Sequence, residues 1–174
     1  MITLFIISSI ICIGYAIFIY SEFSVSSISE SYYMFEKRKK GLGMMFYGWS
    51  ILTSITLLPL WLEITPNSFQ FIPFLSSISL IAVGCFPDYK NEHNKAHSLS
   101  ALFAGVLSIL WGIFVDLWII PVLSITTTSL IVLIISFLKK GNLKENLKSI
   151  GLTFWVELSA FVSIYSCVLY KILN

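Results

Sequence analysis

The chain has 174 residues, of which 57% are hydrophobic and only 11% are charged, with a formal net charge of +2. Soluble domains carry about 25% charged residues, and a chain this apolar could not cover its surface with polar groups in water. The composition therefore excludes a water-soluble globular protein and predicts an integral membrane protein. The length allows one domain, spanning residues 1–174.

Six long apolar segments follow one another along the chain. Each is close to the ~20 residues that a helix needs to cross a bilayer, and none alternates like a membrane β-strand. A backbone in lipid must satisfy its own hydrogen bonds, so each segment is expected to be a helix. The segments are residues 2–20, 42–62, 69–86, 96–115, 120–138 and 150–169. The sequence thus predicts an all-α, polytopic transmembrane bundle of six helices.

The first segment resembles a signal peptide in position only. No Lys or Arg precedes it, and no small-residue cleavage site follows it. We therefore expect it to be retained as the first spanning helix.

Positive charges are confined to alternate connections. Ten of the eleven Lys and Arg residues lie in the first, third and fifth connections, residues 21–41, 87–95 and 139–149. Lys and Arg are kept on the cytoplasmic side of a membrane. The pattern predicts that these three connections are cytoplasmic and that both termini are outside. Because the bases are explained by topology, no nucleic-acid partner is expected.

Residues 27–33 (SISESYY) form a polar and aromatic stretch after the first helix. Ser29 could cap a short interfacial helix, and Glu30 could reach back into the mouth of the bundle. The alternative is a simple interfacial anchor formed by the tyrosines. Later in the chain, residues 139–149 (KKGNLKENLKS) fit either a short amphipathic helix or a plain basic loop.

His93 and His97 are four residues apart, so on a helix they share one face. Two imidazoles in this arrangement can bind zinc, with Asp88, Glu92 or Glu30 as further ligands. The alternative is that both are interfacial residues. Below His97 the fourth helix carries a face of small residues, so His97 is expected to face the bundle. These small residues are Ala101, Gly105, Ser108 and Gly112.

Glu157 is the ionisable residue that lies most clearly inside a predicted span, ~10 Å below the cytoplasmic surface. Burying such a group costs a few kcal/mol, which makes it a candidate functional residue. The alternative is a protonated or hydrogen-bonded packing contact between helices.

The candidate residues converge on the cytoplasmic half of the bundle. We expect a polar cluster there that binds a lipid headgroup, a small solute or a partner protein. Its predicted members are Ser29, Glu30, Asp88, His97 and Glu157. No catalytic motif of soluble enzymes is present. No cofactor is expected in this reading, and the partners are membrane lipids, with a partner protein or a homo-oligomer as further possibilities.

Two other functions fit the same residues. One is an intramembrane, metal-dependent lipid hydrolase with His93, His97 and Asp88 as zinc ligands and Glu157 or Glu30 as general base. The HxxxH spacing is similar to that of alkaline ceramidase-type zinc hydrolases, although there it belongs to the last of seven helices. The other is a small transporter or oligomeric pore that uses Glu157 as a proton- or cation-sensitive site.

Short stretches of the chain resemble a known family. Residues 27–30, the Phe86-Pro87-Asp88 sequence and His97 with Ala101 resemble the bacterial six-helix membrane family catalogued as domain of unknown function 998. The layout is more distantly similar to a eukaryotic membrane family that includes autophagy modulators and a GPI-lipid remodelling factor. Residues 27–33 and the FWxExxxF stretch from Phe154 to Phe161 also look like small Bacteroidetes membrane proteins. The resemblance implies a six-helix architecture in the bacterial cytoplasmic membrane and a lipid-related role.

Overall fold

The computed structural model describes residues 1–87, 90, 94–139 and 141–174. Within them the chain forms helices and no strands. Six helical stretches among these residues are long and apolar enough to cross a membrane. They are Ile2–Phe23, Met44–Ile64, Asn67–Cys85, Asn94–Phe114, Ile119–Leu138 and Leu152–Leu173. The protein is therefore an all-α polytopic membrane protein, as the apolar segments predicted.

The six spans are built from the following helices. The first combines α1 (Ile2–Ser9), a π-helical turn η1 (Ile10–Gly14) and α2 (Tyr15–Phe23). The second is α4 (Met44–Ile64), and the third joins the 3₁₀ turn η3 (Asn67–Phe69) to α5 (Phe71–Cys85). The remaining spans are α6 (Asn94–Phe114), α7 (Ile119–Leu138) and α9 (Leu152–Leu173). The last span begins after the predicted residue 150 because Gly151, at φ +76°, breaks the helical path there.

Shorter helices lie in the connections. The first connection holds a 3₁₀ turn, η2 (Ile28–Glu30), and α3 (Ser31–Arg38), and the fifth holds α8 (Leu143–Ile150). The helical alternative for residues 139–149 is thus confirmed, and the plain loop is wrong. Asn146 anchors α8, because its Nδ2 donates to the carbonyls of Ser136 at 3.0 Å and Lys139 at 2.8 Å. These bonds satisfy carbonyls near the end of α7 that lack helical partners.

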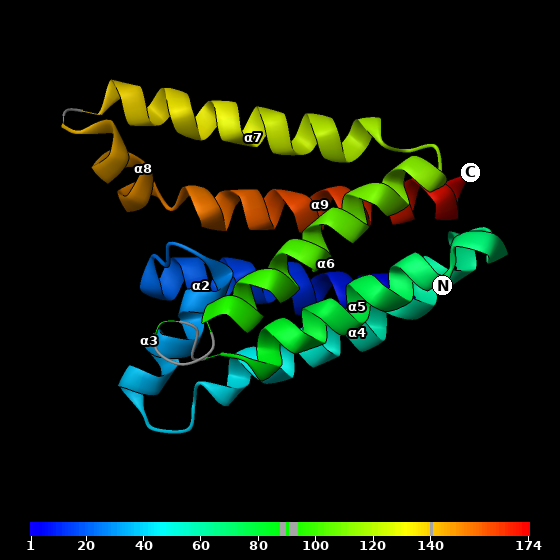
Figure 1. Cartoon of the computed structure of the whole chain (residues 1–174), viewed down its shortest axis with the longest axis horizontal. Helices are drawn as coiled ribbons and strands as arrows, with labels where there is room; N and C mark the ends of the chain where they lie inside the picture. The colour runs from blue at the N-terminus through cyan, green and yellow to red at the C-terminus, as the bar shows by residue number, and fades with distance from the viewer. Residues whose placement is uncertain (88–89, 91–93, 140) are drawn as a thin grey trace.

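The spans pack in two closely associated groups. α5 packs against both α4 and α6, and α7 packs along α9 (Figure 1). α4 and α5 approach closely at Gly84, where an added Cβ would lie 2.0 Å from Ser50 Oγ. α5 and α6 are joined by a 2.9 Å hydrogen bond between the hydroxyls of Ser76 and Ser108. Small residues and hydroxyl contacts of this kind hold helices together in lipid.

Polar contacts also tie the first span to the rest of the bundle. Ser8 Oγ lies 2.6 Å from the Tyr165 hydroxyl of α9, and the Thr56 hydroxyl of α4 donates to Ser8 Oγ at 2.9 Å. Outer faces are apolar instead, with exposed side chains such as Leu102 on α6 and Ile131 on α7. Polar contacts inside and apolar side chains outside are the arrangement that a lipid environment requires.

The connections that were predicted to be cytoplasmic lie at one end of the bundle. Figure 1 shows α3, α8 and the start of α6 at one end of the bundle, and both chain termini at the other. We call the first of these ends the loop end. The described parts of the three basic connections therefore share one end, as predicted, and Ser29 and Glu30 lie in the first of them.

Candidate ligand-binding site

A partly buried turn lies at the loop end of the bundle. It comprises residues 24–31, between α2 and α3, and we call it the serine turn. Ser24 leaves α2 in the left-handed region at φ 50° and reverses the chain. Ser27 then caps η2, because its hydroxyl accepts the Glu30 N–H at 3.2 Å. The predicted cap at Ser29 is wrong: Ser27 has the extended backbone that places its oxygen before the turn.

The serine turn is bonded directly to α9. The Ile28 N–H donates to Glu157 Oε2 at 2.7 Å, and the Phe154 N–H donates to the Ser26 carbonyl at 2.9 Å. Gly151 permits this contact, because an added Cβ there would lie 3.1 Å from the Val25 carbonyl oxygen. Glu157 is therefore hydrogen-bonded, and its partner is a backbone N–H of the first connection.

His97 connects the serine turn to the end of α5. Its Nε2 lies 3.0 Å from Ser29 Oγ, and its Nδ1 lies 3.1 Å from the Val83 carbonyl and 3.0 Å from the Phe86 carbonyl. Carbonyls only accept, so Nδ1 carries a proton and helps to cap α5. His97 is 6% exposed and faces the bundle, as predicted.

These contacts bear on the predicted zinc site. Both ring nitrogens of His97 already meet protein oxygens, so a metal would have to displace one of them. His93, Asp88 and Glu92 lie outside the described residues. Within the described part of the chain, no three His, Cys, Asp or Glu side chains come together in a way that could hold a metal ion. Zinc binding stays a prediction.

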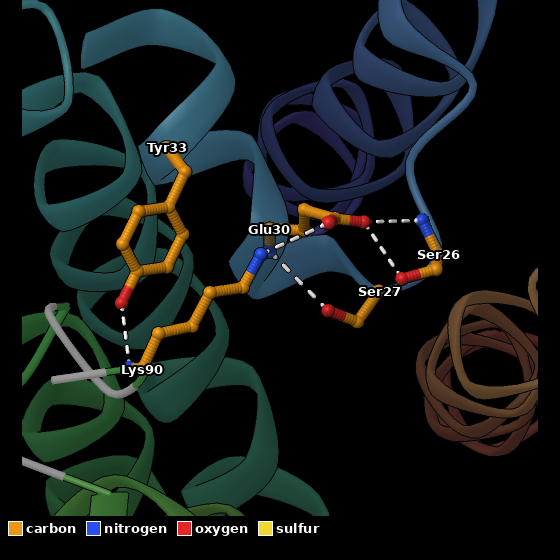
Figure 2. A network of polar contacts seen from close by, with 5 residues as sticks. All are labelled: Ser26, Ser27, Glu30, Tyr33 and Lys90. Atoms are coloured by element: carbon orange, nitrogen blue, oxygen red, sulfur yellow. Dashed lines mark hydrogen bonds and ion pairs between the residues drawn. The ribbon is translucent and has the colours of Figure 1, made fainter. Parts of the chain in front are cut away.

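Glu30 forms a separate network at the rim of the serine turn (Figure 2). Its Oε2 accepts the Ser26 N–H at 2.8 Å and the Ser26 hydroxyl at 2.7 Å, and its Oε1 lies 3.1 Å from Lys90 Nζ. The Lys90 N–H donates to the Tyr33 hydroxyl at 2.7 Å, and the ammonium lies 4.6 Å from the centre of the Tyr33 ring. The network thus joins the first connection to the third.

The charge of Glu30 follows from this geometry. Partial burial raises the pKa of Glu30, but the hydroxyl and N–H of Ser26 and the ammonium of Lys90 together outweigh burial. They hold the pKa of this carboxyl below its ordinary value. Glu30 is therefore an ionised, fully engaged anchor of the serine turn.

A cavity of about 130 Å³ lies between α4, α5, α6 and α9, behind the serine turn. Ser29 and Glu157 line it together with apolar side chains such as Phe46, Leu57 and Phe161. The cavity wall runs along α4 from Phe46 to Trp61, a rise of about 22 Å at 1.5 Å per residue. A buried apolar cavity of about 150 Å³ is large enough to bind benzene.

Three side chains of the cavity wall carry a buried polar atom with no hydrogen-bond partner among the described residues. They are Trp49 Nε1, Trp61 Nε1 and Ser77 Oγ. Glu157 Oε1 likewise makes no hydrogen bond within the described part of the chain. Buried polar groups in proteins are nearly always paired, with protein or with other molecules. The wall is therefore apolar over most of its area and carries the carboxyl group of Glu157.

No protein-family model, curated protein or solved structure was found to match this chain. The resemblance to the six-helix bacterial family therefore stays a prediction.

Only some of the residues in the predicted polar cluster lie together in the structure. Ser29, His97 and Glu157 do come together at the serine turn, Glu30 lies at its outer rim, and Asp88 is outside the described residues. Sequence reasoning missed the cavity and the tryptophans of α4. A signal was present in the hydroxyl residues inside the second and third apolar segments, which mark an inward face. These are Ser50, Thr53, Ser54, Ser76 and Ser77.

Proposed function

We propose that this integral membrane protein binds a small, largely apolar molecule with one polar end in the cavity between α4, α5, α6 and α9. The polar end would lie at Ser29 and Glu157, and the apolar part would extend along α4 toward Trp61. The single observation that carries the proposal is the cavity of about 130 Å³, which places a carboxyl group on an otherwise mainly apolar wall.

Two features support binding over a purely structural void. Ligand pockets are typically apolar with a few polar groups that fix orientation, and this wall has that composition. The cavity wall also carries Glu157 Oε1, which makes no hydrogen bond within the described part of the chain and can pair with water or with a polar atom of a ligand. The metal-dependent hydrolase has less support, because both nitrogens of His97 contact protein oxygens.

The proposal is tested by filling the cavity. At Gly105, which lines the cavity, an added Cβ would meet nothing within 4 Å, so Gly105→Leu should extend into the space without a backbone clash. Gly48→Leu is the matched control, because Gly48 has equally open surroundings and does not line the cavity. Both variants and the wild type are purified in an uncharged maltoside detergent, and bound molecules are extracted and identified by mass spectrometry.

We expect a molecule that co-purifies with the wild type and with Gly48→Leu at a constant molar ratio. Gly105→Leu should lose most of it, because the added side chain occupies the same volume. Identical extracts from all three proteins would contradict ligand binding in this cavity.

A further inference from the structure

Glu157 is the one ionisable side chain among the described residues that line the cavity. We propose that the ligand is a small organic cation, such as a protonated or quaternary amine with an apolar tail, and that Glu157 is its counter-ion. This ligand class rests on the proposed function, because it assumes that the cavity is occupied by a bound molecule.

The first support is the geometry of the carboxyl group. Glu157 Oε2 accepts the Ile28 N–H at 2.7 Å, and an N–H donor of this kind stabilises a carboxylate. Oε1 makes no hydrogen bond within the described part of the chain and belongs to a side chain that is partly exposed on the cavity wall. One oxygen is thus held by the fold, and the other is left to meet a ligand.

The second support is an aromatic cluster beside this carboxyl. Phe161 lies one helical turn after Glu157 on α9, so the two side chains share a face. The Trp49 ring contacts the Phe161 ring edge-on at 5.7 Å between centroids, and it stacks on Phe46 at 5.7 Å. All three rings line the cavity. Phe161 is the partly exposed ring of the three, and an aromatic face next to a carboxylate is the kind of surrounding that binds an organic ammonium group.

The third support is the absence of positive charge on the described cavity wall, where no Lys, Arg or charged partner of Glu157 is found. Lys90, at the rim of the serine turn, is paired with Glu30 at 3.1 Å. An anionic or phosphate-bearing ligand would meet Glu157 without a compensating charge, which a low-dielectric site strongly disfavours. A cationic group instead removes the cost of an isolated carboxylate in the membrane.

A matched pair of probes tests the ligand class. Butyltrimethylammonium and 2,2-dimethylhexane have the same shape, with a charged nitrogen in one and a carbon in the other. Pentanoate supplies the opposite charge. Binding of each is measured by calorimetry and tryptophan fluorescence in the same uncharged maltoside detergent, for the wild type and for Glu157→Gln, Phe161→Leu and Gly48→Leu.

Glu157→Gln is informative because the Gln amide oxygen can still accept the Ile28 N–H, so the serine turn keeps its contact with α9. We expect the wild type to bind the cation at least about tenfold tighter than the hydrocarbon, with pentanoate weakest. Glu157→Gln should lose about tenfold or more in affinity for the cation and change little for the hydrocarbon. Phe161→Leu should weaken cation binding about two- to fivefold, and Gly48→Leu should match the wild type.

The outcomes separate the ligand class from the proposed function. Equal binding of the cation and the hydrocarbon, or cation binding that survives Glu157→Gln, would overturn the cation and leave the cavity as a binding site. The same holds if neither probe binds while Gly105→Leu still loses a co-purified molecule. Failure of both probes together with identical extracts from wild type and Gly105→Leu would overturn both proposals.

Discussion

The carboxylate of Glu30 is held from two sides, by the N–H and hydroxyl of Ser26 and by the ammonium of Lys90. The side chains of Lys90 and Glu30 are 48% and 19% exposed, so their ion pair alone contributes little stability. The two bonds from Ser26 are different, because they lie within four residues of Glu30 and fix the shape of the serine turn. Glu30 therefore acts mainly as a local clamp and secondarily as a link to the third connection.

Acid should loosen this clamp. Because the pKa of Glu30 is lower in the folded chain than in the unfolded chain, ionised Glu30 stabilises the fold above the ordinary Glu pKa of about 4.3. That stability is lost as the pH falls through the lower folded value. We expect the thermal midpoint of the wild type in detergent to fall more steeply below about pH 4.3 than that of Glu30→Gln. Parallel pH curves for the two proteins would contradict the role of Glu30.

At the residue scale, the sequence predicted that Ser29, His97 and Glu157 lie near one another, but not what they contact. Ser29, His97 and Glu157 could be grouped because helix periodicity and charge asymmetry place them at one end of the bundle. Their partners are mostly backbone atoms, at Ile28, Val83 and Phe86. Every residue type has the same backbone groups, so the sequence does not show which of them a side chain will contact. Cap assignment failed for a similar reason, since Ser27 and Ser29 are chemically identical.

The contact between α4 and α5 depends on one glycine. An added Cβ at Gly84 would lie 2.0 Å from Ser50 Oγ and 2.9 Å from Ser50 Cβ, so the two helices could not keep their present separation. Ser50 and Ser54 continue this interface, where the Ser54 hydroxyl lies 3.3 Å from the Ser77 carbonyl of α5. The close approach also places α5 on the cavity wall. A change in the separation of α4 and α5 would therefore change the shape of the cavity.

Gly84→Ala should therefore destabilise the protein by about 1–3 kcal/mol, the usual cost of overpacking. Gly48→Ala is the matched control on α4, since its added Cβ would meet nothing within 4 Å. It should be neutral or stabilising by up to about 1 kcal/mol, because alanine favours helix over glycine. The free energy of unfolding is measured by titration of mixed micelles with a denaturing detergent. Equal stabilities of the two variants would show that the helices can separate at no cost.

At the element scale, the spanning helices were predictable and the short helices were less so. A run of about 20 apolar residues in lipid has few alternatives to a spanning helix. The positions of the spans can therefore be predicted from the apolar composition of each segment. α3 and α8 are eight residues each, too short for intrinsic propensity to decide, and their stability comes from contacts with the bundle. The π-helical turn at Ile10–Gly14 lies inside a uniform apolar run, which carries no signal for a change in helix type.

For the whole molecule, the arrangement of the connections gives a direct test of orientation. The described parts of the three basic connections share the loop end, and retention of Lys and Arg on the cytoplasmic side predicts that this end faces the cytoplasm. In a background with Cys12, Cys85 and Cys167 replaced by alanine, single cysteines are placed at exposed positions of the two ends. Lys39→Cys and Lys139→Cys report on the loop end, and Asn67→Cys reports on the opposite end.

A membrane-impermeant maleimide should label Asn67→Cys on intact cells, because its end faces outward. Lys39→Cys and Lys139→Cys should react only after the membrane is permeabilised. Labelling of Lys39→Cys on intact cells would reverse the predicted orientation and would place the serine turn and Glu157 near the outer surface.

The hydrogen bond between Ile28 and Glu157 joins positions 129 residues apart in the chain. A ribosome adding roughly 5–20 residues per second needs on the order of ten seconds to synthesise that stretch. The second to fifth spans are made during this interval, while the serine turn still lacks its partner on α9. The compartment between the helices is thus completed last in biosynthesis, when the final helix supplies its remaining wall.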